Sequence, residues 1–198
     1  MSAAVRLFNE RGFERAAMEE IAERAGLSVA TVYNYFRSKA DICLAIYQAD
    51  RELVRGATDQ VIADPPADPV EAVCRLMEAD FETELPFVEA GAWEALIAAA
   101  FAAQPRLAAA FVEDGVMRVK QFRRLLEALR ARGAIAPDAD ITSAAEILGG
   151  LNLSHFINGM VRLRAGAPGP RRRLLDAAAK RALRRQARQL MKGLANPE

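Results

Sequence analysis

Apolar residues recur at helical spacing from the start of the chain. Two groups of them, each followed by a glycine, are Ala4, Leu7 and Phe8 before Gly12, and Met18, Ile21, Ala22 and Ala25 before Gly26. Residues three and four positions apart share one face of a helix, so each group predicts a short helix with one packed face. A glycine directly afterwards permits the positive φ that ends a helix in a tight turn.

The segment after Gly26 predicts a third short helix with two different sides. Ser28 is a good N-cap residue. On a helical wheel, one side carries Val29, Val32 and Phe36, and the other carries Ala30, Thr31, Asn34 and Tyr35. One side can therefore pack, while the other can contact a partner. Two short helices joined through residues 25–28 have the spacing of a helix-turn-helix, whose second helix enters the major groove of DNA.

The remainder of the chain is also predicted to be helical. Ser38 and Asp41 resemble a capping box and begin a fourth helix, which we expect to end near residue 61 or 62. Prolines at 65, 66 and 69 interrupt the helical pattern. The apolar spacing beyond them predicts helices at about 70–85, 88–102, 105–132, 140–165 and 170–194. The prediction is an all-α fold with two domains, a three-helix helix-turn-helix domain at 1–47 and a larger helical bundle at 48–198.

Charge and composition limit the classes of function. The chain has 198 residues and a net charge of +1, so any binding of nucleic acid must come from a local patch. Residues 24–39 include basic side chains and no acidic one. Cys43 and Cys74 lack metal-ligand spacing and are predicted to be buried free thiols in a reducing cytoplasm. We find no secretory signal, and the apolar run at 95–103 falls short of the roughly 20 residues that span a bilayer.

No catalytic motif stands out in the sequence. The patterns G-x-S-x-G, H-E-x-x-H, paired C-x-x-C and a phosphate-binding glycine loop are absent, and the chain has one histidine. We therefore expect a cytoplasmic protein that is not an enzyme, with no cofactor, no metal site, no catalytic residues and no membrane partner.

The amino-terminal motif resembles the DNA-binding domain of the tetracycline-repressor (TetR) family. The resemblance rests on Gly12-Phe13, on residues 21–28 and on residues 31–39. It implies that the third helix enters the major groove and that its N-cap Ser28 is one of the DNA-binding residues. Ala30, Thr31 and Asn34 would lie nearest the bases, and Tyr33, Tyr35 and Lys39 would contact phosphates. Ala16-Ala17 stands where many relatives have threonine, so a side-chain cap of the second helix is not expected. A basic arm ahead of the first helix, with its minor-groove contacts, is not expected either.

The resemblance implies that the larger domain binds a small ligand and forms a homodimer. An apolar pocket with a few polar groups is the usual form of such a site. Candidate pocket residues are Phe81, Trp93, Met117, Phe122, Asn152, His155 and Phe156. The aromatic and methionine side chains could equally fill the core. Asn152 and His155 need an interface, a water or a ligand, and the sequence leaves the three open.

The last two helices are the predicted dimer interface. Gly149, Gly150 and Gly159 would let a neighbouring helix approach closely. The final helix carries an apolar stripe that needs a partner, formed by Leu175, Ala179, Leu183, Ala187, Leu190 and Leu194. On the opposite face, arginines are expected to be solvated or paired with acids.

The function hypothesis is a homodimeric transcriptional repressor that binds double-stranded palindromic operator DNA. A small apolar effector in the larger domain would release it. The alternative is a helical ligand-binding or interaction protein whose DNA-reading face is weakened. Substituting Thr31 and Asn34 distinguishes the two, because only a regulator would lose operator specificity.

Overall fold

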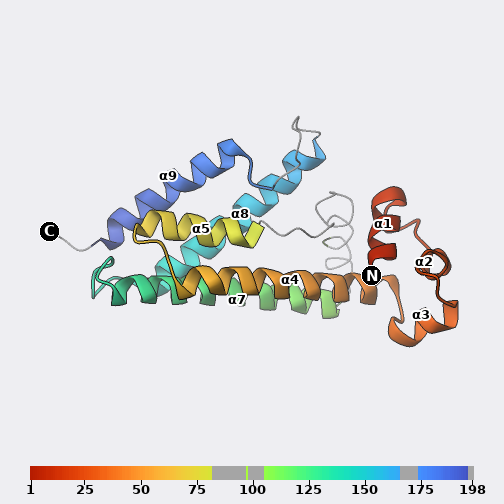
Figure 1. Ribbon diagram of the computed structural model, residues 1–198. Helices are drawn as coiled ribbons and strands as arrows, with labels where there is room; N and C mark the ends of the chain where they lie inside the picture. The colour runs from red at the N-terminus through yellow and green to blue at the C-terminus, as the bar shows by residue number, and fades with distance from the viewer. Residues whose placement is uncertain (82–96, 98–104, 166–173, 196–198) are drawn as a thin grey trace. The chain divides into compact units, whose positions relative to one another are not determined.

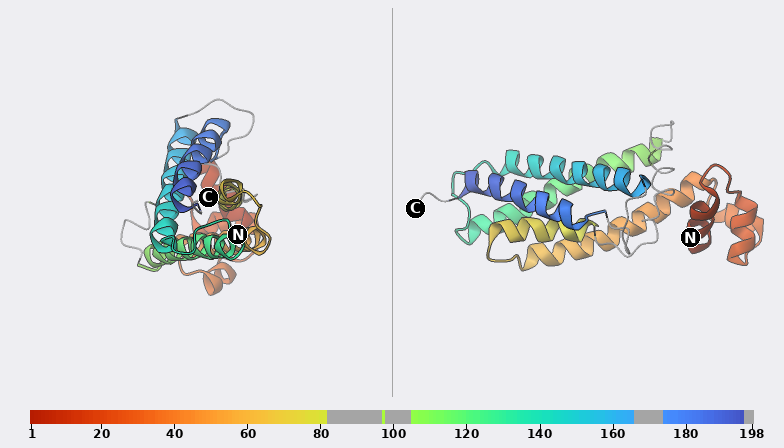
Figure 2. Two further views of the ribbon diagram at one scale, coloured as in Figure 1. Left: turned by 90° about the vertical axis from the view of Figure 1, so that its left-hand side faces the viewer. Right: turned by 90° about the horizontal axis from the view of Figure 1, so that it is seen from above.

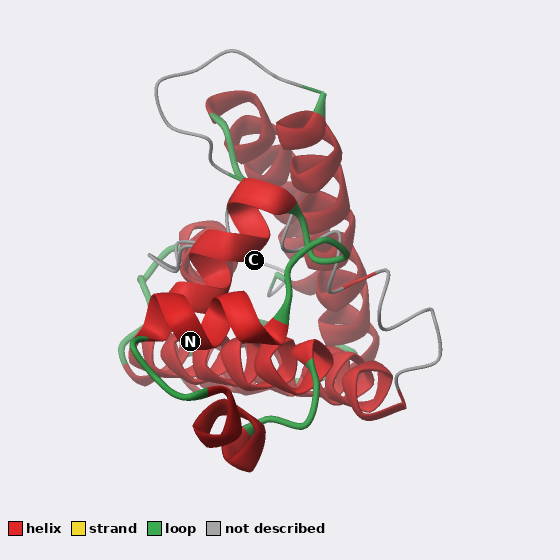
Figure 3. Cartoon of the chain, turned by 90° about the vertical axis from the view of Figure 1, so that its right-hand side faces the viewer, coloured by secondary structure: helices red, strands yellow, loops and turns green. Residues whose placement is uncertain are grey.

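The computed structural model describes residues 1–81, 97, 105–165 and 174–195. Every regular element in these ranges is a helix, and none of the described residues forms a strand (Figure 3). The helices labelled in Figure 1 are α1 (Ser2–Arg11), α2 (Met18–Ala25), α3 (Val29–Tyr35), α4 (Lys39–Ala63), α5 (Pro69–Phe81), α7 (Pro105–Ala131), α8 (Ile141–Arg164) and α9 (Ala177–Leu194). The predicted all-α fold is confirmed.

The chain divides into two compact units, and two of the three divisions between them fall inside the long helices α4 and α7. One unit contains residues 1–51 and 84–113, and the other contains residues 52–83 and 114–198. The predicted domain boundary after residue 47 stays a prediction.

The first unit contains the three short amino-terminal helices. Their shared core consists of Ala4, Leu7, Phe8, Ala22 and Val32, all at most 5% exposed. Ion pairs on the surface join α1 to α2: the Arg24 guanidinium lies 2.6 Å from the Glu10 carboxylate, and Arg11 pairs with Glu20. Small apolar contacts therefore set the packing of these helices, since exposed ion pairs add little stability.

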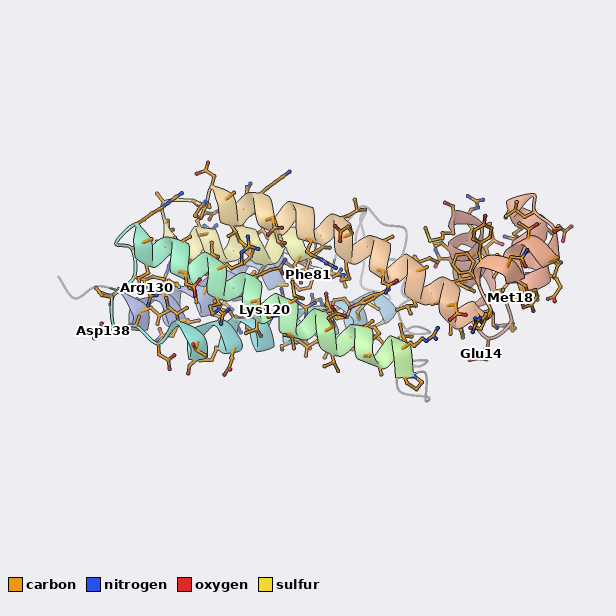
Figure 4. The ribbon with its side chains drawn as sticks, turned by 90° about the horizontal axis from the view of Figure 1, so that it is seen from below. Glu14, Met18, Phe81, Lys120, Arg130 and Asp138 are labelled. Atoms are coloured by element: carbon orange, nitrogen blue, oxygen red, sulfur yellow. The ribbon has the colours of Figure 1, made fainter. Side chains whose placement is uncertain are left out.

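The second unit is a helical bundle in which α5 packs on α9 (Figure 2). Helices α5, α7, α8 and α9 all contribute buried leucines to its core, including Leu76, Leu125, Leu126, Leu148 and Leu183. Arg130 and Asp138, labelled in Figure 4, mark the region where α7 ends and the chain turns towards α8. Burial of these branched side chains is the main source of the unit's stability.

Helix ends agree with the sequence at the prolines and differ at the last helix. Helix α4 ends at Ala63 and α5 begins at Pro69, as the proline-rich connection predicts. The sequence predicts the last helix from 170, but α9 begins at Ala177 because Asp176 is its N-cap: the Asp176 carboxylate accepts the Ala179 N–H at 2.7 Å. The helix predicted at 88–102 lies outside the described residues apart from residue 97, as does the end of the helix predicted at 70–85.

The apolar stripe of α9 already has a partner within its own chain. Leu175, Ala179, Leu183, Ala187 and Leu194 are buried at 8% exposure or less. Leu190 is half-buried, and Met191 takes the inward position at 5% exposure. The stripe is therefore part of the core of the second unit, and its residues are buried without a second subunit.

The glycines of α8 likewise serve contacts inside the chain. A Cβ on Gly149 would lie 2.9 Å from Val119 Cγ2, and a Cβ on Gly159 would lie 2.5 Å from the Leu174 carbonyl oxygen. Gly150 faces open space, with no atom within 4 Å of a Cβ built there. Two of the three glycines thus fix α8 against its own unit, and one faces outwards.

Candidate nucleic-acid interface and ligand site

The turn before α3 is built by a glycine and a capped helix start. Gly26 has the left-handed conformation, with φ 68° and ψ 29°. Ser28 follows as N-cap, and its hydroxyl oxygen accepts the Thr31 N–H at 3.0 Å. The Ser28 and Thr31 hydroxyl oxygens are 2.7 Å apart. The predicted N-cap is confirmed, and this turn fixes the direction in which α3 leaves α2.

One side of α3 packs and the other meets solvent. Val32 is 5% exposed and anchors the helix, whereas Ala30, Asn34, Tyr33 and Tyr35 are exposed, Tyr35 at 78%. Thr31 is half-buried. A helical surface of this kind can present an amide and two phenol groups to a partner. Their roles in binding stay predictions.

Val29 and Phe36 differ from the prediction that they share the packed side. Val29 is 38% exposed, because the first turn of this short helix projects beyond the core. Phe36 lies past the last helical residue in an extended conformation, with φ −136°, and is half-buried. The wheel assumes a regular helix through residue 36, and the helix ends at Tyr35.

Lys39 joins the start of α4 to the connection between α1 and α2. Its ammonium Nζ donates to the carbonyl oxygens of Phe13 at 2.6 Å and of Glu14 at 3.0 Å, and lies 4.8 Å from the centre of the Phe13 ring. Glu14 and Met18, labelled in Figure 4, lie at this connection and at the start of α2. Sequence reasoning expects a phosphate contact here and misses this structural role, because the partners are backbone atoms of a distant turn.

The start of α2 lacks a side-chain cap, as expected from Ala16-Ala17. The N-cap is Ala17, which makes no side-chain hydrogen bond. The Glu20 carboxylate instead accepts the Ala17 N–H at 3.4 Å. A phosphate contact from a capping hydroxyl is therefore not available at this position.

The apolar residues of the predicted pocket fall into three groups. Phe81 and Phe156 are brought together, with stacked rings whose centres are 6.4 Å apart, and Figure 4 labels Phe81. Phe122 is fully buried at 1% exposure, and Met117 is half-buried. Trp93 lies outside the described residues. Membership of one pocket stays a prediction for all of them.

The polar members of that set are both buried on α8. His155 is 8% exposed, and its Nε2 lies 2.9 Å from the Gln186 side-chain oxygen on α9. Asn152 is 1% exposed, and neither its amide nitrogen nor its oxygen has a hydrogen-bond partner. Both residues are already buried in a single chain. Neither of them therefore needs a dimer interface to be removed from solvent.

Two polar pairs, one buried and one half-buried, cannot be predicted from the sequence. The Gln121 amide donates to the Thr58 hydroxyl at 2.6 Å, which joins α7 to α4, and Arg118 Nε lies 3.2 Å from the Asp80 carboxylate, which joins α7 to α5. Spacing along one helix cannot pair these residues, since the partners are on different helices. The available signal is a polar residue at an inward position of an otherwise apolar face.

The chain begins with three short helices, of which the third is capped and exposed, and a larger helical domain follows. This is the architecture of a helix-turn-helix protein with an added helical bundle. Residues 1–46 match the family model described as bacterial regulatory proteins, tetR family. The amino-terminal domain is therefore similar to the DNA-binding domain of the TetR family of bacterial regulatory proteins. Proteins of this family are transcription factors and not enzymes.

Curated relatives match in the amino-terminal region. An HTH-type transcriptional regulator of Staphylococcus aureus strain USA300 is 36% identical over 50 residues, which make up 25% of this chain. The same match spans 27% of the relative's length, about a quarter of it. This similarity concerns the helix-turn-helix domain.

Solved structures share the fold over nearly the whole chain. The TetR family regulator PfmR of Thermus thermophilus is 22% identical, with a TM-score of 0.61 and coverage of 98% of this chain and 97% of its own. A TetR-family regulator of Mesorhizobium loti is 21% identical, with a TM-score of 0.70 and coverage of 98% and 94%. SmeT, solved as a complex with triclosan, is 20% identical, with a TM-score of 0.71 and coverage of 98% and 88%. These likenesses concern the fold.

Two kinds of feature are absent from the described residues. None of the described helices is long and apolar enough to cross a membrane. Within the same ranges, no group of three or more histidine, cysteine, aspartate or glutamate side chains could hold a metal ion.

Proposed function

We propose that this protein is a homodimeric transcriptional repressor that binds a palindromic operator through α3 and is released by a small apolar effector. The observation that carries the proposal is the surface of α3. Ala30, Thr31 and Asn34 follow the Ser28 cap on one side of a helix that Val32 anchors. An asparagine amide both donates and accepts and can read a base edge, while Tyr33, Tyr35 and Lys39 can hold phosphates.

Homodimer formation through the last two helices supplies the second recognition helix. Helix α8 offers the apolar contacts: Ile147, Leu153, Ile157 and Val161 are 48–61% exposed. Ile147, Gly150, Ser154, Ile157 and Val161 follow one another at intervals of three and four residues, so they form one seam along the helix. The small residues at its centre would let two copies of α8 approach closely. Dimer symmetry matches an operator whose half-sites are about 34–36 Å apart or a multiple of it.

The effector is proposed to bind in the second unit and to act on α4. The carboxyl-terminal half of α4 is tied to α7 by the Thr58–Gln121 hydrogen bond and by the Asp59–Arg124 ion pair at 2.6 Å. A ligand that favours a different arrangement of these helices would shift the proportion of DNA-competent dimers. The fold shared with SmeT, which was solved as a complex with triclosan, supports a small-molecule ligand. A regulator of this kind would act in the cytoplasm.

The test begins with selection of bound duplexes from a random-sequence library. Selected DNA is then titrated by fluorescence anisotropy with the wild-type protein and with the Thr31→Ala/Asn34→Ala variant. We expect enrichment of a palindrome that wild type binds at least about 1,000-fold more tightly than random DNA. No enrichment, or equal binding of selected and random DNA, defeats the operator proposal. A ligand that tightens operator binding defeats release by the effector.

A further inference from the structure

Asn152 is an exception among the buried polar side chains of the second unit. Gln121 is paired with Thr58, Asp80 with Arg118 and His155 with Gln186. In the described part of the chain, Asn152 is the residue for which both side-chain polar atoms are buried and lack a hydrogen-bond partner. An amide that leaves water without new partners costs about 1–3 kcal/mol. A leucine at this position would avoid that cost.

Neither a second copy of the chain nor a small shift of α8 supplies a partner for this amide. A dimer interface cannot reach it, because Asn152 is already 1% exposed in the single chain. A small shift of α8 is also opposed, because the helix is held on both sides of Asn152 by close contacts. Gly149 lies against Val119, and Gly159 lies against the Leu174 carbonyl, where even a methyl group would be too close. The amide is therefore held at an inward position, where a water or a ligand group can complete its hydrogen bonds.

The neighbouring side chains on the same helix suit a mainly apolar ligand. Phe156, one turn further along α8, stacks on Phe81 of α5. His155 turns its Nε2 to Gln186 and so has its own partner. A ligand beside Asn152 would thus find an aromatic pair, together with one amide that offers two N–H donors and one carbonyl acceptor.

We infer that Asn152 is the polar anchor of the effector site, and that the effector is an apolar molecule ending in a neutral group whose donor and acceptor are bonded to the same carbon. A primary carboxamide, a lactam or a protonated carboxylic acid has this arrangement. Each can form two parallel hydrogen bonds with the asparagine amide. This inference rests on the proposed effector-binding function of the second unit, and it selects the chemical class of the effector.

A charged end group suits the site less well than a neutral one. Transfer of an ion out of water costs far more than transfer of an amide unless an opposite charge pairs with it. The Asn152 amide carries no net charge and has no protein partner within hydrogen-bond distance to supply one. A neutral end group satisfies the amide and avoids this cost.

The test compares matched probes on the full-length protein in the absence of DNA. Hexanamide and decanamide are the carboxamide probes, and methyl pentyl ketone and methyl nonyl ketone are controls of the same length and shape that lack the N–H donors. Isothermal titration calorimetry measures binding to wild type, to Asn152→Leu and to Asn158→Leu, which makes the same substitution at an exposed position of α8. Wild type and Asn158→Leu are expected to bind at least one carboxamide about tenfold more tightly than its ketone.

Asn152→Leu is expected to bind the ketone as wild type does and to lose the preference for the carboxamide over the ketone. No carboxamide preference in wild type, or the same preference in Asn152→Leu, overturns the inference. Nuclear magnetic resonance of wild type provides a second measurement that needs no variant. Decanamide should shift the Asn152 side-chain NH₂ signals and methyl nonyl ketone should not. Equal shifts, or an ordered water that keeps both signals unchanged, also overturn it.

Operator binding is scored separately, so the two proposals fail in different ways. If the protein binds no preferred DNA sequence but discriminates the probes at Asn152, the repressor function fails and the ligand site stands. If it binds an operator and shows no carboxamide preference, the reverse holds.

Discussion

Asn34 on α3 and Asn152 on α8 carry the same amide in opposite surroundings. Asn34 is exposed, so water satisfies its amide until a partner replaces that water. Asn152 is buried with both polar atoms unpaired. The Asn34 amide is not desolvated in the free protein, and its proposed role is to select a partner. The Asn152 amide lowers stability as long as no partner is present.

This difference corresponds to the two kinds of recognition that we propose for this chain. An exposed polar helix can meet a large, wet surface such as the major groove, where contacts to base edges give specificity. A buried polar group can meet only a molecule small enough to enter the bundle.

The largest effect is expected at the exposed amide. Thr31→Ala/Asn34→Ala should weaken binding to the selected operator by at least about 100-fold and leave binding to random DNA nearly unchanged, because each good base contact gives about 1–3 kcal/mol of discrimination. Fluorescence anisotropy with both duplexes measures this. The exposed Gln60→Ala variant on α4 is the control. Retained specificity in the double variant would favour the alternative of a ligand-binding protein with a weakened DNA-reading face.

The outer face of α8 is the next test. Ile157→Arg places a charge within the proposed apolar seam and should raise the dimer dissociation constant by at least about 100-fold, since burial of an unpaired charge costs several kcal/mol. Analytical ultracentrifugation at several concentrations measures it, and Ile157→Ala should have a smaller effect. If Ile157→Arg dimerises as wild type does, the interface lies elsewhere.

Features that depend on neighbouring residues can be predicted from the sequence, whereas contacts between distant elements cannot. The local features of α3, namely the Gly26 turn and the Ser28 cap, depend on residues close in sequence and can be predicted from spacing. The contacts of Lys39 with Phe13 and of Gln121 with Thr58 cross between elements, and a helical wheel carries no information about them. The apolar stripe of α9 is correctly predicted as a packed face, but sequence cannot tell a packed face inside the chain from one between subunits.

Lys39 is expected to show a smaller, mixed effect. Lys39→Ala should weaken binding to operator and random DNA alike by about tenfold and reduce the slope of log affinity against log salt by about one. The variant also loses two hydrogen bonds to the Phe13 and Glu14 carbonyls, so its melting temperature should fall. Lys39→Arg keeps the charge and serves as the control. A fall in stability with an unchanged salt slope would assign Lys39 to structure alone.

Asn152→Leu should raise the stability of the free protein. Replacement of an unpaired buried amide by an apolar group of similar size should raise the melting temperature by about 2–6 °C, on the basis of a cost of about 1–2 kcal/mol for the unpaired amide. Differential scanning calorimetry without ligand measures this, and Asn158→Leu should change little. A lower melting temperature for Asn152→Leu would mean that the amide is already satisfied in the free protein.

The smallest effect concerns the thiol of Cys43. Burial raises its pKa from an ordinary value of 9.0 to about 12, and the Lys39 charge opposes that rise. Because the folded pKa is the higher one, the contribution of this thiol to stability is complete below about pH 9 and is lost as the pH rises towards about 12. At neutral pH, iodoacetamide should label Cys43 only after unfolding, as judged by mass spectrometry. Rapid labelling of the native protein would show that the thiol is accessible.

The most direct measurement of the central claim is the ratio of operator to random-DNA affinity for wild type and for the Thr31→Ala/Asn34→Ala variant, determined in one buffer of fixed salt concentration. We predict a ratio of at least about 1,000 for wild type that falls towards one in the variant, while affinity for random DNA stays the same. A wild-type ratio near one, or a ratio that the double substitution leaves unchanged, would contradict the claim that α3 reads an operator.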